Sequence, residues 1–347
     1  MSPFALASLF VSTAWPCGGL FHDLGELAHS DEQMALFDRT VADQTTVSYA
    51  VNYKGDATSF GWVIPIPGAF QSLIDGDLAD FSALLDQTNP LLYEQVVDDG
   101  GCGYSATSKG LAGGGMDTGA SRGEVTIVAS GISATYTFTV LEATSEDALL
   151  SWLSDNGWDV AESEPSIAAY VADGIWQFVA IGLVPTGSGS RGMLPPVNIT
   201  YSGERAIYPA RMVRYAMVDE LHTIIWVRAS TPTAVSDGWT QAEVGELAGE
   251  LGADASAIYA NRLRLLGGDR PGYGLVYSQA EGDGWLTRFD ALTEKEANTA
   301  DATFSASDDT TPVRATITLS EEGEATHEAA LLAVPLLVAG WGLRRRR

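Results

Sequence analysis

The sequence predicts an α+β fold in which antiparallel β-sheet predominates and several short helices lie between the strands. Short runs of alternating apolar and polar residues recur along the chain, which is typical of half-buried strands. Helical patterns interrupt these runs irregularly, whereas a parallel α/β fold would alternate strand and helix one for one. With 347 residues, of which 46% are hydrophobic and 18% charged, the chain can bury a large core.

Two strands are expected near the start of the domain. Residues 47–53 alternate apolar with small or polar side chains, which predicts a half-buried strand. The stretch FGWVIPIPG at residues 60–68 follows a Gly55-Asp56 turn signal, so we expect the chain to turn back into a second strand. Because proline lacks the N–H of a sheet hydrogen bond, this strand should end, or run along an edge, at Ile64.

Helices are expected where apolar residues recur at helical spacing. The segments with this spacing are residues 78–85, 144–156, 243–251 and 256–266. Asn89-Pro90 should stop the first of them. A capping pattern from Thr144 to Asp147 should start the second, and Asn156-Gly157 should end it.

The remaining apolar runs are short and rich in aromatic and β-branched residues, so they predict strands. They are residues 124–130, 135–141, 175–183, 197–201, 210–218, 221–229, 285–289 and 313–319. Residues 98–123 are glycine-rich and predict an irregular loop. A phosphate-binding loop would need Gly-Lys-Ser/Thr, but Gly110 follows Lys109.

The charge balance limits the partners. Lys and Arg number 19 against 45 Asp and Glu, for a net charge of −26. A phosphate-binding surface needs clustered basic residues, and only Arg211/Arg214 and Arg262/Arg264 come close outside the C-terminus. We expect a solvated acidic surface and no nucleic-acid partner.

The N-terminus predicts export. Residues 4–11 are nearly all apolar, and Ser12-Thr13-Ala14 supplies the small residues that signal peptidase requires. We interpret residues 1–14 as a signal peptide; the alternative is a buried first strand. Trp15-Pro16 before the first cysteine do not fit a lipoprotein signal.

The chain has two cysteines, Cys17 and Cys102, and each lies beside glycine. Disulfides persist in exported proteins, so a Cys17–Cys102 bridge is the natural hypothesis. Two unpaired buried thiols are the alternative. A metal site is disfavoured, because two cysteines without CxxC spacing supply too few ligands.

The C-terminal residues 321–347 combine an acidic spacer, a hydrophobic segment and four arginines. Residues 329–343 are 15 uncharged residues, about 22 Å as a helix and short of the ~30 Å hydrocarbon core. The arginines form a cytoplasmic stop and a tryptophan can lie at the interface. The anchor residues are Leu331, Leu332, Leu336, Leu337, Val338, Trp341, Arg344, Arg345, Arg346 and Arg347.

We therefore predict three parts: the signal peptide 1–14, an exported β-rich domain at 15–320, and a membrane-anchoring tail at 321–347 with its C-terminus cytoplasmic. Two alternatives for the tail stay open. It also resembles bacterial sorting signals that are removed by cleavage, and it could be a buried C-terminal helix of the domain.

Several segments in order resemble a bacterial family known as domain of unknown function 2330. They are CGGLF at 17–21, YKGDATSFGWVIPIPG at 53–68, WLSDNGWDV at 152–160, YVADGIWQFVAIGL at 170–183, LPPVNITYSGERAIYP at 194–209 and WLTRFDAL at 285–292. The resemblance implies an exported, membrane-associated protein and brings no known activity with it.

No catalytic motif stands out. His22, Glu26 and His29 could share one helix face, but they lack the HExxH arrangement, so incidental surface residues are the simpler interpretation. His222 is most simply a packed or edge histidine. The aromatic residues Trp62, Trp176 and Trp226 lie within strand patterns and are expected in the core.

We expect no metal and no cofactor. The leading interpretation is a non-catalytic envelope domain, anchored in the membrane, that binds a cell-wall polymer or an envelope protein. The alternative is an extracytoplasmic hydrolase that uses carboxylates. A hydrolase would require polar residues of 53–68 and 194–209 to converge in one cleft with perturbed acids.

Overall fold

The computed structural model describes residues 19–21, 32–54, 61–95, 115–117, 125–158, 163–184, 191–217, 220–236, 238–266 and 271–320. Within them the helices are α1 (Leu78–Thr88), α2 (Glu146–Asp155), α3 (Glu164–Asp173), α4 (Ala210–Val213) and α5 (Ala255–Leu266), with the 3-10 turns η2 (Arg214–Ala216) and η3 (Lys295–Ala297).

The strands of the first half are β1 (Gly19–Phe21), β2 (Glu32–Asp38), β3 (Gln44–Lys54), β4 (Gly61–Ile66), β5 (Phe70–Asp75), β6 (Leu91–Gln95), β7 (Gly115–Asp117), β8 (Val125–Ile132) and β9 (Tyr136–Ala143). Those of the second half are β10 (Gln177–Leu183), β11 (Arg191–Met193), β12 (Val197–Ser202), β13 (Ala206–Tyr208), β14 (Glu220–Ala229), β15 (Thr233–Ser236), β16 (Thr240–Glu243), β17 (Glu246–Glu250), β18 (Gly272–Glu281), β19 (Gly284–Glu294), β20 (Ala302–Ala306), β21 (Val313–Arg314) and β22 (Thr316–Ser320).

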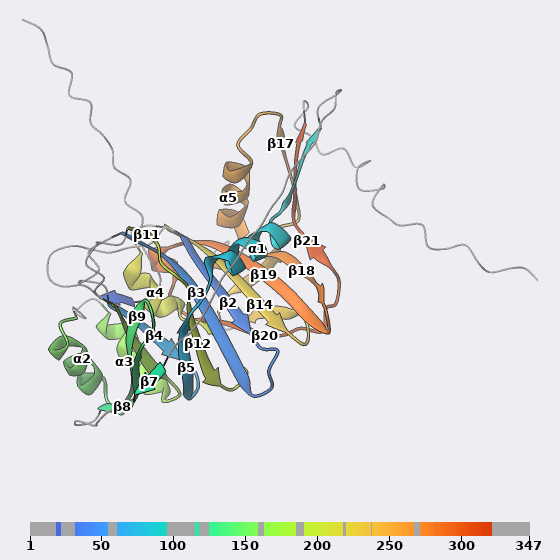
Figure 1. The fold of residues 1–347 in the computed structure, drawn as a ribbon. Coiled ribbons are helices and arrows are strands. Elements are labelled where there is room, and N and C mark those ends of the chain that lie inside the picture. The colour runs from blue at the N-terminus through green and yellow to red at the C-terminus, as the bar shows by residue number, and fades with distance from the viewer. Residues whose placement is uncertain are drawn as a thin grey trace, which may run out of the picture.

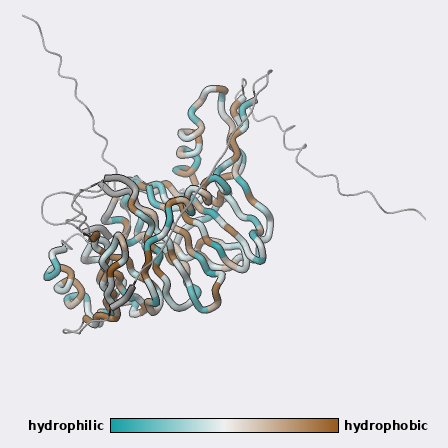
Figure 2. Tube along the Cα trace, in the orientation of Figure 1, coloured by the Kyte–Doolittle hydropathy of each residue, from teal (hydrophilic) through white to brown (hydrophobic). Residues whose placement is uncertain are grey.

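Two sheets packed face to face form the centre of the molecule (Figure 1). The smaller has the order β1-β4-β10-β9-β8-β7, and the larger has β16-β18-β19-β14-β2-β3-β12-β5, with β11 beside β3 and β21 beside β18. Side chains from both sheets, such as Trp62 and Phe37, meet in one buried cluster. Hydrophobic residues occur throughout both sheets (Figure 2), and along β12 buried side chains alternate with partly buried ones, because successive residues of a strand point to opposite faces.

Helices cover the outer faces of both sheets. Leu149 and Leu153 of α2 and Ile167 of α3 pack against the smaller sheet, and Phe81 and Leu84 of α1 pack on the larger one. At one end, α5 and the small parallel sheet β17-β22-β6 project together (Figure 1). The layers are therefore α2/α3, smaller sheet, larger sheet and α1, with α5 at the margin.

The observed fold agrees with the predicted α+β class, since it is rich in β-strand and most strand pairs are antiparallel. Three of the four predicted helices form as α1, α2 and α5. The Asp77 side chain starts α1 by accepting a hydrogen bond from the N–H of Ala79 at 2.9 Å. The cap of α2 is Ser145, one residue after the predicted Thr144, and it accepts from the N–H of Ala148.

Residues 47–53 and 60–68 both contain strands, as predicted, and the Gly55-Asp56 turn signal between them lies outside the described residues. The two strands are not neighbours, because β3 lies in the larger sheet and β4 in the smaller one. β4 also continues through Pro65 to Ile66. β1 pairs with β4 only as far as Val63, so beyond that residue one side of β4 is an edge within the described residues, where a sheet tolerates proline.

Residues 210–218 do not form the predicted strand. They begin as the helical turn α4, followed by η2, because a short apolar run fits either structure and tertiary contacts decide. The turn directs Met212 into the cluster beneath α2 and α3, while Ala210 and Val213 enter the central core.

The predicted helix at residues 243–251 is also wrong. Residues 246–250 form β17, which runs parallel to β22 and alternates exposed with partly buried side chains. Gly245 precedes it with φ of 73°, which favours glycine. Gly249 lies against the end of the Ile258 side chain of α5, and a Cβ atom there would require that side chain to move.

Several expectations concern residues outside the described ranges. They are the signal peptide, Cys17, Cys102, the helix-face set His22, Glu26 and His29, and the tail at 321–347 with its hydrophobic helix. Of the glycine-rich segment 98–123, the described residues 115–117 form β7. None of the helices in the described ranges has the length and apolar character needed to cross a bilayer.

Candidate functional site

Two hollows lie on the outer face of the larger sheet, one on each side of α1. The strand register explains both. Along β2 and β14, Glu32 lies opposite His222 and Asp38 opposite Arg228. Between these polar ends the same face is apolar and α1 covers it, with the Phe81 ring 5.9 Å from the Trp226 ring. Leu84 lines one hollow and Leu85 the other.

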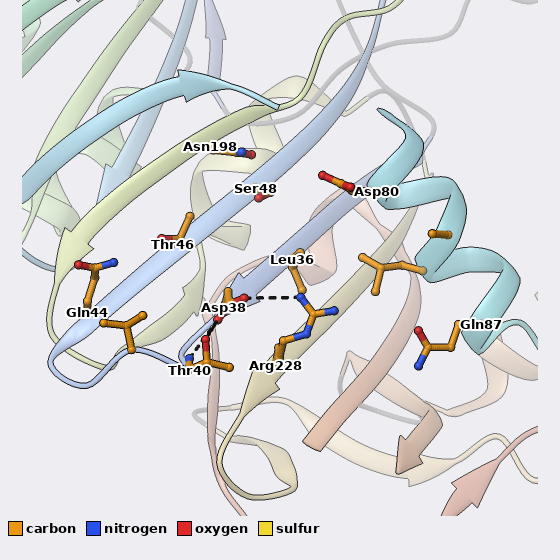
Figure 3. A pocket seen from close by; sticks show the side chains of 13 residues that line it. Leu36, Asp38, Thr40, Gln44, Thr46, Ser48, Asp80, Gln87, Asn198 and Arg228 are labelled. Atoms are coloured by element: carbon orange, nitrogen blue, oxygen red, sulfur yellow. Dashed lines mark hydrogen bonds and ion pairs between the residues drawn. The ribbon is translucent and has the colours of Figure 1, made fainter. Parts of the chain in front are cut away.

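The first hollow, which we call the sheet groove, has a volume of about 500 Å³ (Figure 3). Cross-strand pairing places Arg228, Asp38, Thr46 and Thr200 in one row across four strands. The hydroxyls of Thr46 and Thr200 are 3.0 Å apart and hydrogen-bonded. The adjoining row adds Ser48 and Asn198; the other polar lining residues are Thr40, Gln44, Asp80 and Gln87.

Carboxylates neutralise the single guanidinium that lines the groove. Arg228 donates from Nε to Glu281 at 2.7 Å and lies 3.5 Å from Asp38. Burial alone would lower the pKa of Arg228, but these contacts outweigh it and raise that pKa. Asp38 also accepts from the N–H and hydroxyl of Thr40, at 3.0 and 2.6 Å. With Asp80 on the rim, the groove offers hydroxyls and amides in an acidic setting.

The second hollow, the α5 cavity, has a volume of about 600 Å³. It lies between α5, the end of α1 and the β14/β19 region of the sheet. Its lining residues are Glu32, Leu85, Asn89, Pro90, Leu92, His222, Ile224, Ala255, Ser256, Tyr259, Ala260, Leu263, Arg264, Arg288, Leu292 and Ile317. Apolar side chains therefore form much of its wall.

Beside this cavity, buried polar groups converge on Asp290, whose side chain is 0% exposed. Arg288 donates to both of its carboxylate oxygens, at 2.7 and 2.8 Å, and Tyr259 donates its hydroxyl at 2.9 Å. Arg288 also donates to Asn89 at 2.8 Å and lies 5.4 Å from the Trp226 ring centre. Burial alone would raise the pKa of Asp290, but Arg288 and His222 hold it well below its ordinary value.

His222 lies between two carboxylates. Its Nε2 is 3.4 Å from Asp290 and its Nδ1 is 3.5 Å from Glu32. Burial lowers the pKa of His222, but the hydrogen bonds to Asp290 and Glu32 outweigh it and raise the pKa to about 9. At neutral pH the ring is therefore an imidazolium with both nitrogens engaged, which does not suit a general base.

His222 is a packed histidine, one of the two simple interpretations of the sequence; it lies in the central strand β14 and belongs to a polar cluster that the sequence analysis did not predict. A sequence signal for the cluster was present in WLTRFDAL, where Arg288 and Asp290 are two residues apart in an apolar strand and so share one face. Trp62, Trp176 and Trp226 are buried, as predicted.

Of the described residues in the two segments that a hydrolase was expected to bring together, Asn198 alone lines either hollow. The acid with a lowered pKa in the α5 region, Asp290, lies on β19. Among the residues that the structure describes, no three His, Cys, Asp or Glu side chains are placed to hold a metal ion.

Comparisons with known proteins place the chain in a family. The crystal structure of baculovirus P35 is 9% identical, with 82% of this chain and 96% of P35 covered and a TM-score of 0.34. P35 in the caspase-8/P35 complex is 10% identical, with 80% and 90% covered and a TM-score of 0.29. No curated protein matches the chain. Residues 11–311 match the uncharacterized proteins conserved in bacteria that make up DUF2330, and the chain belongs to this family.

Proposed function

We propose that the chain is an exported, membrane-anchored envelope protein whose β-rich domain binds a polar polymer without chemically changing it. The signal-like N-terminus and the arginine-flanked hydrophobic tail support export and anchoring with a cytoplasmic C-terminus. The sheet groove supports binding and is the observation on which the ligand class depends.

The groove fits a neutral polymer rich in hydroxyl and amide groups, such as a cell-wall glycan. Thr46, Ser48 and Asn198 present donors and acceptors on one rigid sheet face, and a few well-placed polar groups are enough to orient a ligand. Asp38 and Asp80 would repel a polyanion, while Arg228 is already paired with carboxylates. An uncharged polymer therefore suits this groove better than nucleic acid or an anionic polymer.

Cosedimentation of the full chain with insoluble cell-wall glycan tests this proposal. Ser48→Trp fills the centre of the groove, and Thr126→Trp, at an exposed position of β8 in the other sheet, is the matched control. We expect the control to bind like the wild type and Ser48→Trp to bind about tenfold more weakly, equivalent to ~1.4 kcal/mol. Circular dichroism melts verify that both variants fold.

Equal cosedimentation of both variants would reject the groove as the binding site. The same incubation distinguishes the alternative function, because a carboxylate-dependent hydrolase would release soluble sugar fragments over time. A binding module leaves the polymer intact.

A further inference from the structure

The α5 cavity has the form of a second binding site, separate from the sheet groove. Its volume of about 600 Å³ falls within the ~300–1,000 Å³ of small-molecule pockets. The larger apolar side chains of its wall are Leu85, Leu92, Ile224, Leu263, Leu292 and Ile317. A ligand with a hydrocarbon portion would bury that portion against them.

The polar part of the wall includes two cationic side chains beside one buried acid, Asp290. His222, Tyr259 and Arg288 lie together, since each contacts Asp290. Asp290 is fully buried and is not part of the lining. The lining also holds Arg264, which is partly exposed and paired with Glu220 at 2.7 Å. Arg264 is therefore neutralised by Glu220, and the buried group of Arg288, His222 and Asp290 carries one excess positive charge, which Glu32 balances.

Glu32 is a replaceable partner of His222. Its carboxylate is 3.5 Å from Nδ1 of His222, and its side chain is 47% exposed. An ion pair with a half-exposed carboxylate is weaker than a buried one, so Glu32 is the partner of His222 that a ligand carboxylate can reach and replace. The contact of His222 with Asp290 is about as long, at 3.4 Å, but the Asp290 side chain is 0% exposed and cannot leave for solvent.

From this arrangement we infer that the α5 cavity binds small aliphatic carboxylates, with the ligand carboxylate replacing Glu32 on His222 and the hydrocarbon chain on the apolar wall. A neutral alcohol lacks the charge that His222 and Arg288 favour, and an amine would be repelled by them. Each methylene placed on the wall should improve affinity about fourfold.

The probe is octanoate labelled with ¹³C at its carboxyl carbon, titrated by NMR into the full chain in lipid nanodiscs, with empty nanodiscs as the blank. We expect saturable binding at one site, with affinity rising from butanoate through hexanoate to octanoate. Octan-1-ol and octylamine should bind more weakly than octanoate. Absence of saturable binding, or equal affinity for octanoate and octan-1-ol, would overturn the inference.

Two pairs of variants locate the ligand. Ala260→Phe should fill the cavity and weaken octanoate binding at least about tenfold, whereas Ala257→Phe, exposed on the same helix and outside the lining, should not.

Glu32→Gln should tighten binding by removing the competing carboxylate. His222→Gln should abolish the preference for octanoate over octan-1-ol. Weaker binding by Glu32→Gln, or unchanged binding by Ala260→Phe, would contradict the assignment. Because none of these residues lines the sheet groove, failure here leaves the glycan proposal intact.

Discussion

Asp290 is the residue on which the buried polar groups beside the α5 cavity converge. It satisfies Arg288, Tyr259 and His222 from one carboxylate, and these partners come from α5 and two neighbouring strands. Removing one partner of a buried ion pair is costly, because the remaining charge loses its counterion in a medium that solvates it poorly.

Asp290→Ala is therefore expected to lower the free energy of unfolding by about 3–5 kcal/mol, since the Arg288 side chain is 3% exposed. Glu220→Ala breaks the partly exposed pair with Arg264 and should cost about 1 kcal/mol or less. Urea denaturation of both variants measures the difference. Equal losses would mean that the buried network does not stabilise the fold.

His222 should make stability depend on pH in a defined window. Burial lowers its pKa, but the contacts with Asp290 and Glu32 outweigh that effect and raise the pKa from the ordinary 6.5 to about 9. The stabilisation is then complete below pH 6.5 and is lost as the pH rises through 9, a change on the order of 3 kcal/mol. Urea denaturation between pH 6 and 10 measures it. His222→Gln should flatten the profile, and an unchanged profile in that variant would assign the effect to another group.

At the scale of the elements, α1 determines where both hollows lie. It covers the apolar middle of the outer sheet face through Phe81 and Leu84 and contributes residues to the sheet groove and to the α5 cavity. Its position depends on a regular start, which the Asp77 cap provides.

Asp77→Ala should lower the free energy of unfolding by about 1 kcal/mol, because the N–H of Ala79 loses its acceptor. Amide exchange in α1 should become faster, while exchange in α2, which lies on the other sheet, should not change. Asp77→Asn keeps an acceptor oxygen and serves as the control. Loss of stability in Asp77→Asn equal to that in Asp77→Ala would contradict a capping role.

At the scale of the whole molecule, the tail should decide where the domain resides. If the tail is the proposed anchor, cells that make the full chain should retain it in the membrane fraction, resistant to salt washing, because an uncharged segment at residues 329–343 followed by arginines is typical of a stop-transfer anchor. A chain that ends at Ser320 should be released. Fractionation with immunodetection measures both.

The fractionation also separates the alternatives for the tail. If the full chain is as soluble as the chain that ends at Ser320, and has not been shortened by cleavage, the tail does not anchor the protein. A membrane-free product shortened near residue 328 would instead indicate a sorting signal that is removed by cleavage.

Local sequence determined the fold class, the burial of Trp62, Trp176 and Trp226, and the positions of α1, α2 and α5. These features depend on periodicity and turn chemistry within about 15 residues, which act before distant parts of the chain meet. The acidic composition likewise indicated a surface unsuited to nucleic acid.

Three features were determined only by the tertiary structure. They are the assignment of strands to sheets, the extended conformation of residues 246–250 and the helical turn at residues 210–213. Each depends on a partner far along the chain: β22 and α5 for β17, and the cores on both sides of the smaller sheet for α4. The polar cluster has the same origin, because Asp290 meets His222 and Tyr259 only when β14, β19 and α5 pack together. Local periodicity places a side chain on a face, but only strand register and packing determine which side chains it meets there.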